Sequence, residues 1–218
     1  MEYRQIKKFQ SLLLQWSTSN LRKFPWRKKK ISPYKIFLAE MLLKRTTAKA
    51  ASSVYPKLVK KYPNLKKLAA AKEKDIIKLV KPIGYPQRSR EMITAAKFLK
   101  NNYSSIPEEK KLLMEVPFIG DYISGAILSL GYDKAYTMVD SNVNRIISRV
   151  YFGRNSQPHI KNEIRNITKE ILPSARHKEF NLALLDVGGL FCHPRFPKCH
   201  LCPLQRVCKF SQENPPKG

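Results

Sequence analysis

The sequence predicts an all-α protein, and three observations support that prediction. Apolar residues recur at helical spacing in one segment after another along the 218 residues. No segment shows the clean alternation of apolar and polar residues that is typical of a half-buried strand. Proline and glycine separate the periodic segments, as at Pro63, Pro82 and Gly84. We therefore expect helices packed on helices around a buried core.

In the first half of the chain, apolar spacing predicts a helix over residues 1–19. A basic, extended connector that begins at Phe24 leads to the next helix. Ser32 is placed to cap that helix and Pro33 to occupy its first position. The further helices that periodicity predicts here cover residues 47–61, 73–81 and 89–102.

In the second half, residues 112–127 read as two apolar helices joined by a tight turn at Pro117 and Gly120. The backbone N–H groups at the start of the second helix are a site for a phosphate. Asp140 is placed to cap a helix over 141–152. The last helices are expected over 159–172 and 177–191.

The charge balance indicates a polyanionic partner. Forty-two Lys and Arg residues stand against sixteen Asp and Glu, which gives a net charge of +26 spread along the whole chain. Such a balance is most often the electrostatic footprint of nucleic acid. A solvated basic surface is the alternative. No apolar run is long enough to span a bilayer, so a membrane-spanning protein is excluded.

The four cysteines of the chain all lie near its end, in the pattern C-x6-C-x2-C-x5-C. They are Cys192, Cys199, Cys202 and Cys208. Four thiolates in one short loop suit one tetrahedral metal ion or one cubane iron–sulfur cluster. Zinc loops usually carry two short cysteine knuckles or mix cysteine with histidine. Disulfides are the remaining alternative, and the absence of a signal peptide disfavours them. The spacing favours a [4Fe-4S] cluster.

This loop resembles the [4Fe-4S] loop of the endonuclease III and MutY branch of the helix-hairpin-helix DNA glycosylases. The resemblance covers about Leu12 to Phe210, and residues 112–127 resemble the family's hairpin. Two departures are visible there. Phe118 replaces the first glycine and disfavours the usual left-handed turn, and Asp121 should weaken the attraction of the hairpin for phosphate.

The resemblance implies two helical domains that flank a DNA cleft. Residues 20–131 would form a helical barrel domain with the helix-hairpin-helix motif. Residues 1–19 and 132–218 would form a discontinuous domain with the iron–sulfur cluster loop. The bound partner would be double-stranded DNA with a mismatched or damaged base, from which the enzyme flips one base and hydrolyses its glycosidic bond.

The resemblance also assigns catalytic roles. Asp140 matches the family's catalytic carboxylate, which would stabilise positive charge on the sugar. Glu40 aligns with a second acid that, if buried, has a raised pKa and protonates a leaving purine. The alternative for Glu40 is a helix-surface residue paired with Lys44. Tyr122 occupies the position of the Schiff-base lysine of bifunctional members. This implies a monofunctional enzyme in which Tyr122 lines the base pocket.

The expected DNA contacts lie at four places along the chain. Arg45, next to Lys44, is the candidate for the wedge or for reading the orphan guanine. Tyr85 and Pro86 lie where relatives place an intercalating residue. The hairpin residue Gly120 and Asn142 beside Asp140 complete the set.

The resemblance favours removal of thymine or uracil mispaired with guanine, because of the Lys44–Thr47 run and the absence of a further C-terminal domain. Removal of adenine opposite 8-oxoguanine or guanine, as in MutY, is the alternative. A non-catalytic iron–sulfur protein that binds DNA or carries electrons is a third possibility, which the presence of both Asp140 and Glu40 disfavours. We expect a cytoplasmic, nucleoid-associated monomer from a prokaryote or archaeon.

Overall fold

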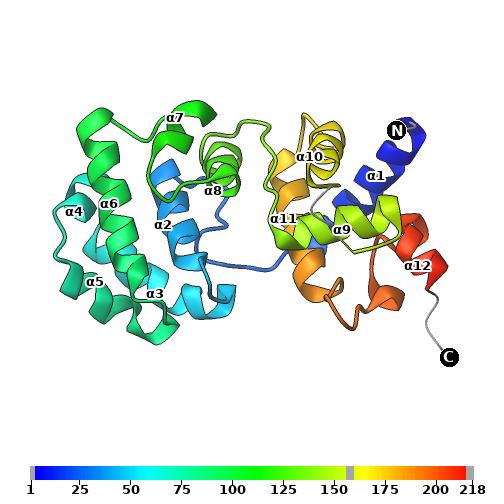
Figure 1. The fold of residues 1–218 in the computed structure, drawn as a ribbon, viewed down its shortest axis with the longest axis horizontal. Helices are drawn as coiled ribbons and strands as arrows, with labels where there is room; N and C mark the ends of the chain where they lie inside the picture. Colours follow the sequence, from blue (N-terminus) through cyan, green and yellow to red (C-terminus); the bar gives the residue numbers. More distant parts are fainter. Residues whose placement is uncertain (1–2, 156–159, 215–218) are drawn as a thin grey trace. The chain divides into compact units, whose positions relative to one another are not determined.

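The structure is a computed structural model that describes residues 3–155 and 160–214. Across these residues all regular structure is helical and no strand occurs, so the all-α prediction is confirmed (Figure 1). The expected helices over 1–19 and 159–172 each begin outside the described residues. The chain divides into two compact units, which we call the hairpin unit (Lys23–Lys134) and the cluster-loop unit (Met1–Arg22 with Ala135–Gly218).

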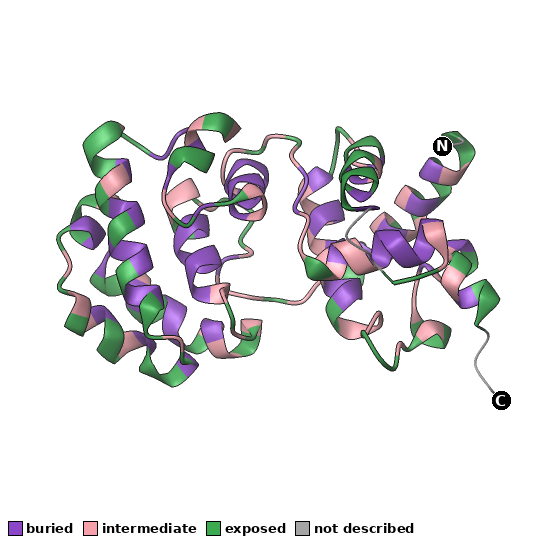
Figure 2. Ribbon diagram, in the orientation of Figure 1, coloured by how far each residue is buried: buried purple, intermediate pink, exposed green. Residues whose placement is uncertain are grey.

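The hairpin unit is built around one buried helix, α2 (Pro33–Leu43). Ser32 caps it and Pro33 is its first residue, as predicted. Every residue from Ile36 to Leu42 is buried, which Figure 2 shows as a nearly continuous purple helix. Helices α3, α6 and α8 pack against it. The remaining elements of the unit are α3 (Ala48–Lys61), α4 (Leu65–Ala69), α5 (Glu73–Val80), η1 (Lys81–Ile83), α6 (Gln87–Asn102), α7 (Lys110–Glu115), α8 (Asp121–Ala126) and the π-helical turn η2 (Ile127–Gly131).

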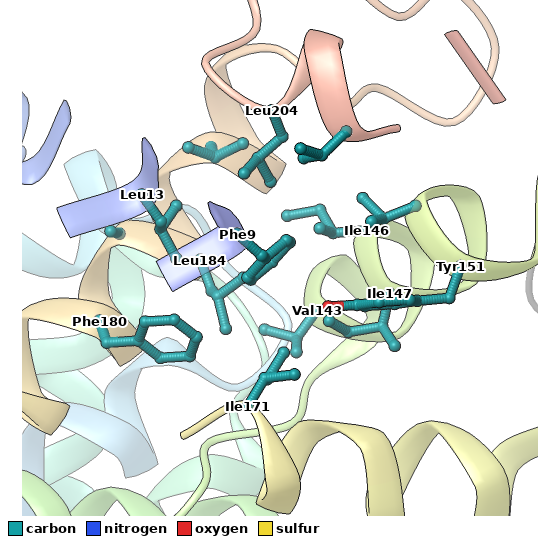
Figure 3. Close-up of a cluster of buried hydrophobic side chains, with 14 of the residues drawn as sticks. Phe9, Leu13, Val143, Ile146, Ile147, Tyr151, Ile171, Phe180, Leu184 and Leu204 are labelled. Carbon is teal, nitrogen blue, oxygen red and sulfur yellow. The ribbon is translucent and has the colours of Figure 1, made fainter. Parts of the chain in front are cut away.

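The cluster-loop unit is built around α9 (Ser141–Phe152), which packs against α10, α11 and α12. Its core draws apolar side chains from α1, α9 and α11 (Figure 3). Phe9 shows this convergence, since its ring lies 6.1 Å from Phe180 and 5.9 Å from Tyr151. The other elements are α1 (Tyr3–Asn20), α10 (Lys161–Glu170), α11 (His177–Leu190), η4 (Cys199–Leu201), η5 (Gln205–Val207) and α12 (Lys209–Glu213).

This packing fixes the N-terminal end of α9. Val143, Ile146 and Ile147 are almost fully buried in the core. Each such side chain contributes about 1.5–3 kcal/mol through the water-exposed area that it loses. Asp140 directly precedes α9 and is therefore attached to a rigidly packed helix. Among the described helices, none is both long and apolar enough to cross a bilayer.

Candidate functional site

Asp140 is held by two hydrogen bonds at the start of α9. Its Oδ1 accepts from the backbone N–H of Val143 at 2.8 Å, which confirms the predicted cap. Its Oδ2 accepts from Nδ2 of Asn142, also at 2.8 Å. In both bonds the carboxylate oxygens act as acceptors. The side chain is half-buried, so it keeps lone pairs for a substrate.

A hydrogen-bond relay connects Asp140 to the cysteine loop. Oδ1 of Asn142 accepts from Nη2 of Arg145 at 2.7 Å. Nε of Arg145 donates to the carbonyl of Cys192 at 2.6 Å, and Nη2 donates to the carbonyl of Gly188 at 3.2 Å. The first cysteine of the loop and the carboxylate are thus joined through two side chains. One signal in the sequence indicates this contact: Asn142 and Arg145 are three residues apart, on one helix face.

Gly188 allows this relay to form. A Cβ built at Gly188 would lie 2.6 Å from Cβ of Asn142, closer than two carbon atoms can approach. The neighbouring Gly189 has no such restriction, because a Cβ there meets only the flexible end of Arg22 at 3.4 Å. Gly188 is therefore required by the close packing of α11 on the start of α9.

The four cysteines line one cavity in the cluster-loop unit. Its other walls include Phe191, Pro197 and Phe210. Burial raises the pKa of the Cys202 thiol to about 12 and that of Cys208 to about 11. Within the described ranges, no group of three or more His, Cys, Asp or Glu side chains forms a site for a metal ion.

A buried arginine completes the wall of this cavity. Arg149 is 2% exposed, and its Nη1 donates to Sγ of Cys192 at 3.3 Å and to the carbonyl of His193 at 2.8 Å. Its guanidinium lies 4.6 Å from the ring centre of Phe210. A thiolate cluster is negatively charged, and N–H···S bonds stabilise that charge. The four thiols and this cation are groups of the kind that surround a thiolate-bound cluster, and the [4Fe-4S] cluster itself stays a prediction.

The hairpin corrects one prediction and qualifies another. Phe118 adopts φ +67°, so the left-handed turn is kept although its residue is not glycine. The expectation that Phe118 disfavours this turn was wrong. Its side chain is 48% exposed, and the aromatic ring therefore extends from the turn instead of entering the core. Asp121 forms an ion pair with Lys110 at 2.7 Å, which offsets its repulsion of phosphate.

The two other predicted catalytic residues also lie in the hairpin unit. Glu40 is 4% exposed in the middle of α2, so the alternative of a helix-surface residue was wrong. Lys44 donates instead to Glu91 of α6. Tyr122 is half-buried in the first turn of α8, two residues after the exposed Gly120 that precedes this helix.

The predicted DNA-contact loops meet within the hairpin unit. Arg45 and Tyr85 both have positive φ, at +54° and +53°. The guanidinium of Arg45 lies 4.9 Å from the ring centre of Tyr85, and Pro86 follows at the exposed start of α6. The ammonium of Lys44 lies 5.3 Å from the ring centre of Phe118. These contacts bring together the loop after α2, the loop before α6 and the hairpin turn.

The candidate residues are divided between the two units. Asp140, Asn142 and the cysteines belong to the cluster-loop unit, whereas Glu40, Tyr122 and the DNA-contact loops belong to the hairpin unit. A DNA cleft between the units, with Asp140 and Tyr122 both facing it, stays a prediction.

Comparison with known proteins places both units in a family. The sequence profile of the HhH-GPD superfamily base excision DNA repair proteins matches residues 38–174. The chain is 30% identical to a thymine/uracil-DNA glycosylase of Methanothermobacter thermautotrophicus, and the match covers 95% of each chain. It is 33% identical to an adenine DNA glycosylase of Buchnera aphidicola subsp. Baizongia pistaciae over 92% of this chain, but it spans only 58% of that relative.

Solved structures agree with this comparison. A thermostable thymine-DNA glycosylase matches with a TM-score of 0.88 and 30% identity, over 96% of this chain and 98% of the other. An endonuclease III trapped with DNA matches with a TM-score of 0.82 and 19% identity, over 98% of both chains, and shows a common fold. The chain belongs to the HhH-GPD superfamily of base excision DNA repair proteins.

Proposed function

We propose that this protein is a monofunctional DNA N-glycosylase that removes thymine or uracil mispaired with guanine. The observation that carries the proposal is the carboxylate of Asp140, which is held in place by Val143 and Asn142. A protein that only binds DNA has no need of such a carboxylate, since phosphates repel it. The family membership and the net charge of +26 support DNA as the substrate.

Asp140 would act on the sugar of the flipped nucleotide. Breaking the glycosidic bond leaves positive charge on the deoxyribose, and an ionised carboxylate next to C1′ stabilises that charge. The same carboxylate accepts a proton from the attacking water. Its two existing hydrogen bonds hold it in one orientation, so it does not reorganise during the reaction.

Tyr122 is the residue that makes the proposed enzyme monofunctional. A strand-cleaving enzyme of this kind needs an amine that forms a Schiff base with the sugar. A phenol cannot form that bond. The product would therefore be an intact abasic site, and strand cleavage would require alkali.

The choice of base rests on similarity along whole chains. The thymine/uracil-DNA glycosylase relative is matched over 95% of its length, and a thymine-DNA glycosylase of Aeropyrum pernix is 34% identical over 85% of its length. Adenine removal is the second candidate, and one observation favours it. Glu40 is buried, and a buried carboxyl group suits the protonation of a leaving purine.

We further propose that the four cysteines hold a [4Fe-4S] cluster. When bound, the cluster would cross-link the loop from Cys192 to Cys208 and stabilise its fold. Arg149 would compensate the charge of the thiolates. The protein would act as a monomer on double-stranded DNA, since one chain supplies every candidate residue.

A panel of duplexes tests the proposed function. Each duplex carries one target base, which is thymine, uracil or adenine, and the panel places each target opposite every common base and opposite 8-oxoguanine. Treatment with alkali then cleaves the strand at abasic sites and so reveals base release. Cleavage of thymine and uracil opposite guanine supports the proposal. Release of adenine alone would assign the adenine activity instead. No release from any duplex would refute glycosylase activity on these mispairs.

A further inference from the structure

Glu91, on the second turn of α6, connects the two loops that carry Arg45 and Tyr85. Its side chain is buried, with 8% of the residue exposed. One oxygen accepts from Nζ of Lys44, and the other accepts from the hydroxyl of Tyr85 at 2.5 Å. Both oxygens of one carboxylate are therefore used by two different loops.

The loops that Glu91 connects are strained. Arg45 and Tyr85 each adopt a left-handed backbone conformation that residues with a side chain rarely occupy. Such conformations persist only where the surrounding structure enforces them, and they cluster at functional sites. Here the enforcing contacts are the bonds to Glu91 and the stacking of Arg45 on Tyr85 at 4.9 Å.

Arg88 also holds the end of α2 and the Tyr85 loop in place. It is fully buried one turn before Glu91 and donates to the carbonyls of Met41 and Leu42 at the end of α2. Its guanidinium lies 5.6 Å from the ring centre of Tyr85. Its Nε and Nη2 have no protein hydrogen-bond partner in the described part of the chain. The first turns of α6 thus anchor α2 and the Tyr85 loop together.

Electrostatics keeps Glu91 in the form that this network needs. Burial favours the neutral acid, but hydrogen bonds from Lys44 and Tyr85 and the charges of Lys44 and Arg88 outweigh it, so the pKa of Glu91 lies below its usual value. The ionised carboxylate accepts both hydrogen bonds. A neutral amide at this position keeps one oxygen for Lys44 but loses the negative charge, and its N–H group meets the Tyr85 hydroxyl only as a donor, which reverses that hydrogen bond.

We propose that Glu91 is a positioning residue that couples Arg45 to Tyr85, so that the two side chains read the base opposite the flipped nucleotide as one unit. The inference rests on the proposed function, because it assigns a role in opposite-base selection to a buried residue. Arg45, exposed at the tip of its loop, supplies donors that suit the acceptors of guanine. The Tyr85 ring fixes the plane of that guanidinium.

The test compares Glu91→Gln with wild type in single-turnover excision of one target base opposite each of the four common bases. We expect the preference for guanine to fall by about ten-fold or more, the scale of one good contact to a guanine edge. Excision of the same base from single-stranded DNA, where no opposite base exists, should change by less than about two-fold. The control is Glu73→Gln, which removes a carboxylate from the exposed pair with Arg90 and should leave the preference intact.

Tyr85→Phe separates positioning from a general loss of structure. It removes the hydroxyl that donates to Glu91 but keeps the ring beneath Arg45. It should also lower the preference for guanine. The double variant Glu91→Gln/Tyr85→Phe should have a guanine preference no lower than that of the more strongly affected single variant. Effects that multiply would overturn the coupling, because two changes that break one shared network are not additive.

A binding readout makes the inference independent of turnover. 2-Aminopurine next to the opposite base reports unstacking when the protein binds, and Asp140→Asn prevents reaction. We expect the fluorescence rise of the bound duplex to be reduced when Glu91→Gln is added. An unchanged rise, or an unchanged guanine preference in an active enzyme, overturns the role of Glu91. Absence of base release by the wild-type protein would instead refute the proposed function, and the fluorescence comparison would still test Glu91.

Discussion

The substitution Gly188→Ala adds one methyl group and tests whether the hydrogen-bond relay through Asn142 positions Asp140. A Cβ there would lie 2.6 Å from Cβ of Asn142, whereas carbon atoms in contact are separated by about 3.5–4.0 Å. Gly188→Ala must therefore displace Asn142 by about 1 Å. Because Asn142 donates to Oδ2 of Asp140, the carboxylate then moves or loses this donor.

The size of the effect follows from the geometry. A misplacement of about 1 Å at a catalytic group costs about 10²-fold in rate. Overpacking costs about 1–3 kcal/mol of stability, and replacing a helical glycine by alanine returns up to about 1 kcal/mol. A net loss of at most about 3 kcal/mol lowers the melting temperature of a chain of this size by no more than about 12 °C. We expect a folded protein with a large defect in base release.

Gly189→Ala is the matched control, one residue further along the same helix. Its added Cβ would meet only the flexible guanidinium of Arg22 at 3.4 Å. It should keep the wild-type rate of base release, and its melting temperature should equal or slightly exceed that of the wild type. The assay is single-turnover base release, followed as strand cleavage after alkali, with thermal melting beside it. If Gly188→Ala releases the base within about two-fold of Gly189→Ala, the relay does not position Asp140.

Three further predictions concern the other parts of the proposal. Borohydride should trap no covalent complex between the wild-type enzyme and DNA. Tyr122→Lys places an amine at that position and should give both trapping and strand cleavage. Trapping by the wild-type enzyme would contradict the role of Tyr122. Cys202→Ser should lose iron and sulfide and weaken DNA binding more than the chemistry on bound DNA, and a purified wild-type protein with stoichiometric zinc and no iron would contradict the cluster. DNA affinity should fall about 10³-fold or more between about 50 and about 200 mM salt if six or more phosphates are contacted, and a flat dependence would mean that the +26 charge does not bind the backbone.

Much of the helical framework could be predicted from local signals. Ser32 and Asp140 cap their helices as their residue types and positions indicate. Apolar periodicity located α2, α3, α5, α6 and α9 because each buries one face or more. The short helix α4 (Leu65–Ala69) was missed, since five residues are too few to show a period.

The contacts that shape the site could not be predicted, because they join residues that are far apart in the sequence. Glu91 meets Lys44 across forty-seven positions, and Arg145 meets Cys192 across the same separation. No local pattern marks such pairs. The turn at Phe118 was predicted wrongly for a related reason. Residue type gives the intrinsic cost of a left-handed conformation, but the packing around the hairpin decides whether the chain adopts it.

The most direct test of the central claim is single-turnover release of thymine from a G:T duplex by Asp140→Asn. Asparagine is as good a helix cap as aspartate, so α9 and DNA binding should be retained. The charge that stabilises the sugar cation is lost, and the rate should fall by about 10²–10³-fold. If Asp140 stabilises the sugar cation, the wild-type protein releases thymine and the variant shows this loss at unchanged affinity. A fall of only a few-fold would show that Asp140 caps a helix and does not catalyse base removal.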